Sequence, residues 1–226
     1  MRAAVIAGVL VAAAASPAEA GRWNEWTGGA TVAYDARYTR ASDGDAIGDL
    51  TEIAEAGLVL RGVGSKAGVG LAAQLDFHLG GGLDGGFAYE LDLLPVGYGA
   101  NLGRRVIAGI MIGAGFSGVT DRVPFAWQYP VEVFVETDLG KRFHLSVFSR
   151  AAFIGGADER QNGADNALFG DETSLGVALR FNRRHERYGY KAGNGYYVGA
   201  VWNRRMDVDF TGVSVGYGIH MIAGGR

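Results

Sequence analysis

The chain has 226 residues, a formal net charge of −3, no cysteine and 38 glycines. The charge balance, without a basic stripe interleaved with aromatic residues, excludes a nucleic-acid-binding protein, and the lack of cysteine excludes a disulfide-stapled domain. Glycine is far above its usual share of about 7%. Because each glycine costs a helix roughly 1 kcal/mol relative to alanine, glycine within apolar stretches disfavours a helical fold.

Residues 1–20 are predicted to be a secretory signal peptide. A positive start is followed by an apolar run over residues 3–15, and residues 18–20 read Ala-Glu-Ala, a small-x-small cleavage pattern. Cleavage after Ala20 would leave one domain, residues 21–226, with the net charge unchanged at −3.

Strict alternation of apolar and polar residues recurs along the rest of the chain and predicts β-strands. The longest uncharged apolar run after the signal, residues 106–116, is too short for a membrane-spanning helix, which needs about twenty residues. We expect ten strands, with eight as the alternative count. Their approximate ranges are 30–38, 50–62, 67–79, 87–93, 104–117, 129–139, 143–154, 173–181, 195–203 and 213–221.

The connections between these strands alternate in length and charge. Short connections pair glycine with basic residues at 64–68, 101–105, 138–142 and 182–191. Longer, acidic connections lie between them, at 40–49, 80–86, 118–128 and 155–171. This alternation predicts an antiparallel up-and-down meander, and closure into a barrel removes its exposed edges.

The distribution of aromatic and basic residues indicates which barrel face is outside. Aromatic residues lie toward the ends of the apolar faces, as in the interfacial girdles of membrane barrels. The chain has three lysines, and all are in predicted turns, whereas a soluble surface usually carries many. We therefore expect an apolar outer face and a polar lumen. The aromatic residues are Tyr34, Tyr38, Phe77, Phe87, Tyr129, Phe143, Phe181 and Tyr217.

The signal peptide, the alternating strands and the unequal connections resemble the small outer-membrane β-barrels of Gram-negative bacteria. Residues 214–221, Ser-Val-Gly-Tyr-Gly-Ile-His-Met, resemble the C-terminal assembly signal of that class. The resemblance implies a monomer in the outer membrane with periplasmic termini. It also implies that residues 214–221 contact the assembly machinery, and that the barrel contacts lipid and lipopolysaccharide.

Charged residues of both signs fall on the faces predicted to point inward. Unpaired burial of a charge costs several kcal/mol, so these groups are expected to form a salt-bridged core. Leucine at Arg150 or Arg180 should then lower the heat resistance of the barrel on unboiled gels. The set is Asp35, Arg37, Glu55, Arg61, Gln74, Asp76, His78, Glu90, Asp92, Glu132, Glu136, His144, Arg150 and Arg180.

Three motifs could indicate other chemistry: a glycine-rich segment, an acidic loop and a His-x-Ser pair. Residues 113–118 match G-x-G-x-x-G, but they lie in a predicted strand, so glycine in a crowded wall explains them better than a dinucleotide. Asp43, Asp45 and Asp49 could gather calcium, although a solvated acidic loop is the better reading. No cofactor is expected.

His144 and Ser146 are the weak catalytic candidates, because a base beside a hydroxyl is the minimum for nucleophilic catalysis. Outer-membrane lipid A deacylases use a His-x-Ser pair, which this pair resembles, and Glu159 is a conceivable third member. The asparagine that follows the serine in that family is Val147 here.

The sequence therefore favours a non-enzymatic outer-membrane barrel, structural or surface-exposed, with a narrow polar lumen that could conduct small ions. A wide porin is not expected, because about eight strands already give an interior filled by side chains. A lipid-modifying hydrolase and a soluble exported barrel that binds an apolar ligand are the alternatives.

Overall fold

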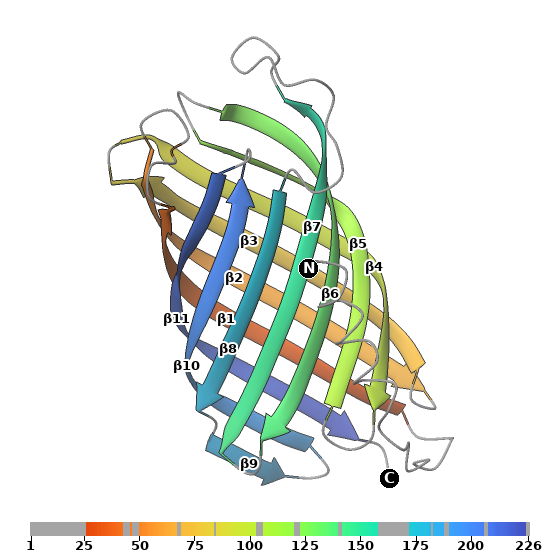
Figure 1. Ribbon diagram of the computed structural model, residues 1–226. Helices are drawn as coiled ribbons and strands as arrows, with labels where there is room; N and C mark the ends of the chain where they lie inside the picture. Colours follow the sequence, from red (N-terminus) through yellow and green to blue (C-terminus); the bar gives the residue numbers. More distant parts are fainter. Residues whose placement is uncertain are drawn as a thin grey trace.

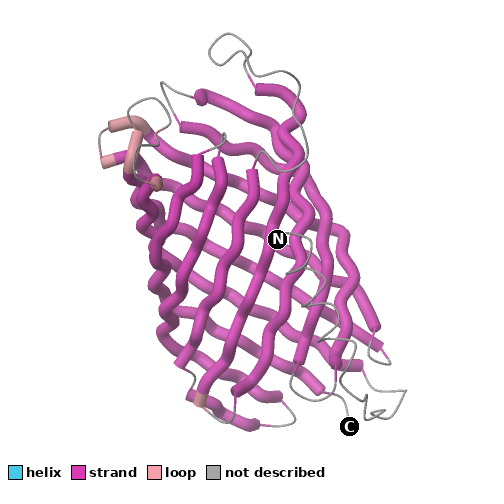
Figure 2. Tube along the Cα trace, in the orientation of Figure 1, coloured by secondary structure: helices cyan, strands magenta, loops and turns pink. Residues whose placement is uncertain are grey.

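The computed structural model is a closed, all-β, antiparallel up-and-down barrel (Figures 1 and 2). Among the described residues, no helix could span a membrane. The structure describes residues 26–42, 46, 50–66, 69–83, 85–102, 106–119, 123–139, 142–157, 172–181, 183–187, 190–205 and 208–224. The strands are β1 (Trp26–Ala41), β2 (Glu52–Lys66), β3 (Val69–Gly82), β4 (Phe87–Leu102), β5 (Val106–Val119), β6 (Val123–Leu139), β7 (Phe143–Ala157), β8 (Glu172–Phe181), β9 (Arg183–Arg187), β10 (Tyr190–Arg205) and β11 (Val208–Gly224).

The wall has ten strand positions, because β8 and β9 share one of them. Both pair with β10, and the register at Arg180 and Tyr197 continues unchanged to Arg183 and Asn194. Each of the ten predicted strand segments overlaps one of these wall positions. The expected all-β up-and-down barrel is therefore confirmed, with the count of ten rather than eight.

Two predicted connections are wrong in extent. The structure places most of residues 182–191 in β9 and β10, so the hairpin reaches beyond the predicted strand ends at the lower edge of Figure 1. It also assigns most of residues 118–128 to β5 and β6. In both places the strands continue past the point where the apolar alternation fades, because ladder hydrogen bonds do not require an apolar partner.

The barrel closes with a definite stagger. Following paired residues once around the wall leads from Gly28 on β1 back to β1 at Arg40, twelve residues further along. The partners on the way are Gly64, Leu71, Tyr98, Ile110, Val133, Ser149, Leu175, Trp202 and Thr211. Ten strands with this stagger tilt about 40° and enclose a wall of about 10 Å radius. Such a lumen is narrow enough for side chains from opposite walls to meet.

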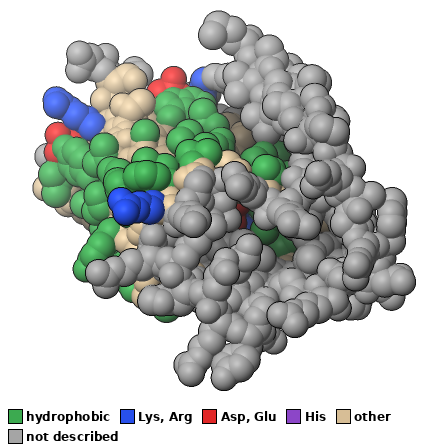
Figure 3. Space-filling view, turned by 90° about the horizontal axis from the view of Figure 1, so that it is seen from below, with side chains coloured by type: hydrophobic (Ala, Val, Ile, Leu, Met, Phe, Trp, Pro, Cys, Tyr) green, Lys and Arg blue, Asp and Glu red, His purple; other side chains and the backbone are tan. Residues whose placement is uncertain are grey.

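The outer surface is apolar and carries two groups of aromatic rings. All eight aromatic residues predicted to face outward are exposed, from Phe77 at 37% to Tyr34 at 58%. Toward the end with the longer loops, Phe87, Tyr89, Phe116 and Trp127 form a row of ring contacts over β4, β5 and β6. Toward the short-turn end, Phe143 contacts Phe181 and Tyr196 contacts Tyr217. Hydrophobic side chains also dominate the described outer wall seen from below (Figure 3).

Glycines inside the barrel give space to rings on neighbouring strands. A Cβ at Gly109 would lie 2.5 Å from the ring of Phe134 and 2.8 Å from the carbonyl oxygen of Tyr98. Four strand glycines pair directly with the residue whose ring lies next to them. The pairs are Gly57 with His78, Gly109 with Phe134, Gly176 with Phe148, and Gly216 with Tyr197. These four glycines therefore serve lumen packing.

Replacing Gly109 with alanine is expected to destabilise the barrel by about 1–3 kcal/mol, the usual cost of overpacking. The added methyl meets both a buried ring and a backbone oxygen, so neither can yield cheaply. Gly62→Ala is the matched control, since a Cβ there has nothing within 4 Å. Urea unfolding of the refolded barrels measures both, and equal midpoints for the two variants would contradict the packing role.

Candidate functional site: the charged lumen

The predicted inward-facing charged residues lie inside the barrel. Period-two alternation turns them inward on β1, β2, β3, β4, β6, β7 and β8, and none of the fourteen predicted residues has a side chain more than 12% exposed. Close to them lie Arg205 and Gln128, which the predicted strand segments did not include. Arg205 lies two residues after the predicted strand that ends at residue 203, and Gln128 lies one residue before the predicted strand that begins at residue 129. Extending the alternation to these positions places both side chains in the lumen.

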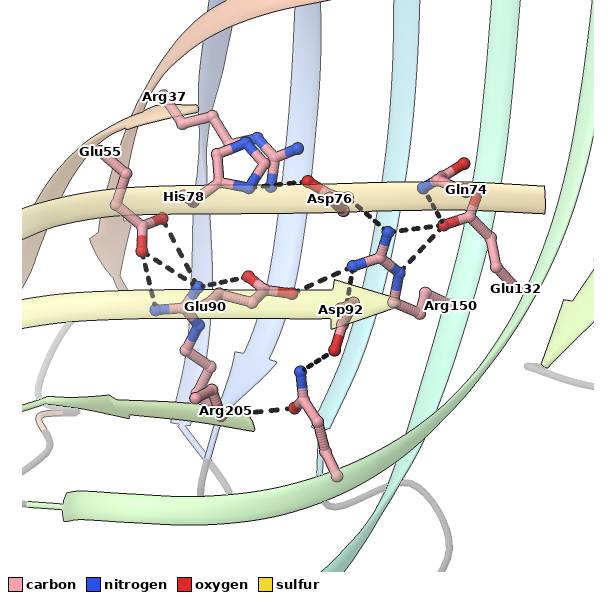
Figure 4. Close-up of polar contacts among 12 residues, drawn as sticks. Arg37, Glu55, Gln74, Asp76, His78, Glu90, Asp92, Glu132, Arg150 and Arg205 are labelled. Carbon is pink, nitrogen blue, oxygen red and sulfur yellow. Dashed lines mark hydrogen bonds and ion pairs between the residues drawn. The ribbon is translucent and has the colours of Figure 1, made fainter. Parts of the chain in front are cut away.

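Arg150, on β7, is the centre of the charged network (Figure 4). Its guanidinium contacts two carboxylates of β4, at 2.7 Å from Asp92 and 3.1 Å from Glu90, and lies 2.7 Å from Glu132 of β6. It also pairs with Asp76, at 2.5 Å. One cation therefore holds four buried carboxylates, and β3, β4, β6 and β7 are tied together across the lumen.

Arg61 extends the network toward the short-turn end. It pairs with Glu132 and, at 2.8 Å, with Glu136, and it donates a hydrogen bond to Gln74. Its guanidinium also lies 4.4 Å from the centroid of the Phe134 ring, within the range of cation–π attraction. Glu132 is thus shared between the two arginines, one at each carboxylate oxygen.

Arg205 extends the network toward the loop end. Its guanidinium lies 3.3 Å from Glu55 and 3.2 Å from Glu90. Gln128 donates a hydrogen bond of 2.6 Å to Asp92. Glu90 and Asp92, which both pair with Arg150, therefore each have a second polar contact.

His78, on β3, lies between the carboxylates of Asp35 and Asp76. Its Nε2 is 2.8 Å from Asp35, and its Nδ1 is 2.9 Å from Asp76, although the second contact is not aligned as a hydrogen bond. Asp35 also accepts from Arg37 at 2.8 Å. This branch joins β1 to the network through Asp76.

Two cavities lie along the lumen beside these ion pairs. The larger is about 90 Å³ and reaches from Arg61 and His144 up to Arg37 and Arg150. The smaller is about 20 Å³ and continues from Arg37 and Arg150 to Arg205. Arg37 and Arg150 therefore line both cavities and lie where the two meet.

Arg180 differs from the other predicted network members. Its Nε and Nη1 are buried without a hydrogen-bond partner, and the described residues provide no ion pair for it. It borders the larger cavity on the side where β8, β10 and β11 present small side chains. The expectation that Arg180 shares a salt-bridged ring with Arg150 is not met among the described residues, since the carboxylates that line this cavity form their ion pairs with other side chains.

His144 and Ser146 line the larger cavity, facing the lumen. His144 Nε2 lies 3.6 Å from Glu136, so the acid beside it comes from β6. Glu159 falls outside the described residues, as do Asp43, Asp45 and Asp49. Within the described ranges, no group of three or more His, Asp and Glu side chains could hold a metal ion. The glycines at 113, 115 and 118 lie in β5 and precede no helix.

Comparisons with known proteins add only distant similarities. No protein-family model matches the chain, and no curated protein matches it. Among solved structures, the toluene transporter TbuX of Ralstonia pickettii has 10% identity and a TM-score of 0.29, over 92% of each chain. The CymD monoaromatic hydrocarbon channel has 8% identity and a TM-score of 0.30, over 90% of this chain and 89% of its own. Scores this low do not bear on what the protein transports or binds.

The architecture inferred from the resemblance to outer-membrane β-barrels is confirmed as a closed, all-β barrel with ten antiparallel wall positions. In the described residues the large apolar side chains of the wall are exposed on the outside and charged side chains are buried inside. This arrangement is the inverse of a soluble barrel, in which the apolar side chains fill the inside. The chain is built as an integral membrane barrel.

Proposed function

We propose that the protein is a non-enzymatic barrel of the outer membrane whose lumen is a narrow, ion-paired passage for small ions. The observation that supports this most directly is the meeting of the two cavities at Arg37 and Arg150. Polar groups line a route past this point, but Arg150 is held across the lumen by four carboxylates. A solute much larger than a hydrated ion has no room there.

The topology supports periplasmic termini and surface-exposed loops. Thr27 near the start of β1 pairs with Gly224 at the end of β11, so both strand ends lie at the short-turn end. In bacterial membrane barrels the short turns are periplasmic and the longer loops are extracellular. Residues 1–20 would then serve as the export signal, and residues 214–221, within β11, as the segment offered to the assembly machinery.

Arg37→Ala is expected to raise single-channel conductance several-fold relative to the wild type in planar bilayers. Arg37 lines both cavities, and Asp35 keeps His78 as a partner after the change, so the barrel should still fold. Arg40→Ala is the matched control on the same strand, because Arg40 faces outward with 66% of its side chain exposed. Identical conductance for wild type and Arg37→Ala would contradict the constriction, and silent membranes with both would contradict conduction itself.

The geometry gives less support to the two alternatives. A soluble barrel for an apolar ligand would not leave Tyr34, Ile112 and Val215 each more than 50% exposed. A lipid-modifying hydrolase would need its lipid to reach His144 and Ser146, which face the lumen behind a wall of paired strands. Lipid A extracted from cells that express the His144→Ala/Ser146→Ala variant should therefore have an unchanged mass spectrum.

A further inference from the structure

The larger cavity has two chemically different sides. On one side are the network side chains of β3, β6 and β7. Asp35 and Arg37 of β1 add to that charged side. On the other side, β8, β10, β11 and the beginning of β1 contribute small or apolar groups, so the space between them is not filled. These include Gly176, Ala178, Val201, Ser214 and Ala33. The cavity is therefore built by a change in side-chain size around the wall at one level of the lumen.

Arg180 lies at the edge of this cavity with its charge unmatched. Its β-sheet partners are His144 on β7 and Tyr197 on β10, and its guanidinium lies 5.7 Å from the centroid of the Tyr197 ring. The residue is 8% exposed, and its Nε and Nη1 lack partners among the described residues. Leaving a buried charged group without a partner costs more than an ordinary lost hydrogen bond.

The carboxylates that line the cavity are already engaged elsewhere. Glu132 and Glu136 pair with Arg61, Asp76 pairs with Arg150, and Asp35 pairs with Arg37. None of these pairs includes Arg180. Arg180 is therefore the arginine of this cavity that has no ion-pair partner among the described residues, and the neighbouring open space can admit a small anion beside it.

We propose that this cavity binds a small monovalent carboxylate through Arg180. Arg180 lines the cavity, and a guanidinium binds a carboxylate through charge-assisted hydrogen bonds, which are stronger than neutral ones. The apolar side chains of Val201 and Ala178 would contact a short hydrocarbon tail. The volume of about 90 Å³ is below that of an engineered cavity of about 150 Å³ that holds benzene, so the ligand has only a few carbon atoms.

This inference goes beyond the proposed conduction, because a closed lumen could bind the same anion. Ligand-observed NMR on the full-length barrel, refolded in detergent micelles, detects binding whether or not ions pass. The probe is sodium propionate, and propionamide serves as the uncharged molecule of the same shape. We expect propionate to bind at millimolar concentration and at least tenfold more tightly than propionamide.

Two lumen variants separate the contribution of the cation to propionate binding from the contribution of the open volume. Arg180→Met removes the cation, and Ala178→Leu keeps the cation but fills the cavity, so both should weaken propionate binding at least tenfold. Arg180→Lys should retain part of the affinity, since it keeps the charge without the planar fork. Arg40→Met, on the outer face, should bind as the wild type does.

A heat-shifted band on unboiled gels shows which variants are folded before they are compared. Equal affinity of the wild type and the folded Arg180→Met variant for propionate would overturn the proposal, as would equal affinity for propionate and propionamide. Displacement of propionate by an equal concentration of chloride would overturn the assignment of a carboxylate.

Discussion

Replacing Arg150 with methionine is expected to destabilise the barrel by about 3–5 kcal/mol, the range seen when one partner of a buried ion pair is removed. The change leaves Asp76, Glu90, Asp92 and Glu132 without their shared cation. Glu132 keeps Arg61 and Glu90 keeps Arg205, whereas Asp92 keeps only neutral Gln128 among its hydrogen-bonded contacts. Urea unfolding in lipid vesicles measures the loss, and the folded band on unboiled gels should disappear at a lower temperature.

Arg180→Met is the matched control for this effect. Because Arg180 has no ion pair among the described residues, removing it should leave the stability unchanged or raise it. The double variant Arg150→Met/Asp92→Asn should recover part of the lost stability, since it removes a carboxylate that has no remaining cation. Equal losses for Arg150→Met and Arg180→Met would contradict the unequal roles that the contacts assign to the two arginines.

The sequence predicts which face of a strand each side chain occupies. Inward and outward positions follow from a period of two, so Asp76 and His78 are placed in the lumen and Phe77 is placed outside without knowledge of the fold. Alternation fails where a strand bulges. The register shifts between Leu93 and Val96, next to Pro95, and Val96 and Tyr98 are exposed although unbroken alternation from Leu94 would place both in the lumen.

The sequence does not predict which charges meet across the lumen. Arg150 on β7 reaches Asp76 on β3 because of the number of strands and the twelve-residue stagger, neither of which is encoded in one strand. For the same reason Arg180 and Arg150, two arginines on inward faces of adjacent strands, look equivalent until the wall is closed. Only then does Arg150 meet four carboxylates, whereas Arg180 has no ion pair among the described residues.

Burying so many charges inside a barrel costs free energy. This cost must be offset by removing the apolar side chains of the outer face from water. In water the described exterior would expose a continuous apolar surface, whereas soluble monomers rarely expose patches beyond a few hundred Å². In a bilayer the same surface is solvated by lipid, and closure pairs the backbone hydrogen bonds of the wall. The charged lumen and the apolar exterior are therefore consistent only with a membrane environment, and a single outward-facing substitution can test this.

Leu58→Arg is expected to destabilise the barrel in lipid vesicles by about 2–4 kcal/mol, the cost of arginine on the lipid face near the bilayer midplane. Leu58 faces outward near the middle of β2, between Tyr34 on β1 and Phe77 on β3. Leu83→Arg is the matched control, because Leu83 follows β3 at the loop end with 64% of its surface exposed, where the cost should fall to about 0–1 kcal/mol. In a soluble barrel both positions would face water and both arginines would be tolerated. Urea unfolding in vesicles that shows equal stabilities for the two variants would therefore contradict the membrane assignment, because the difference between them arises from the depth of lipid around Leu58.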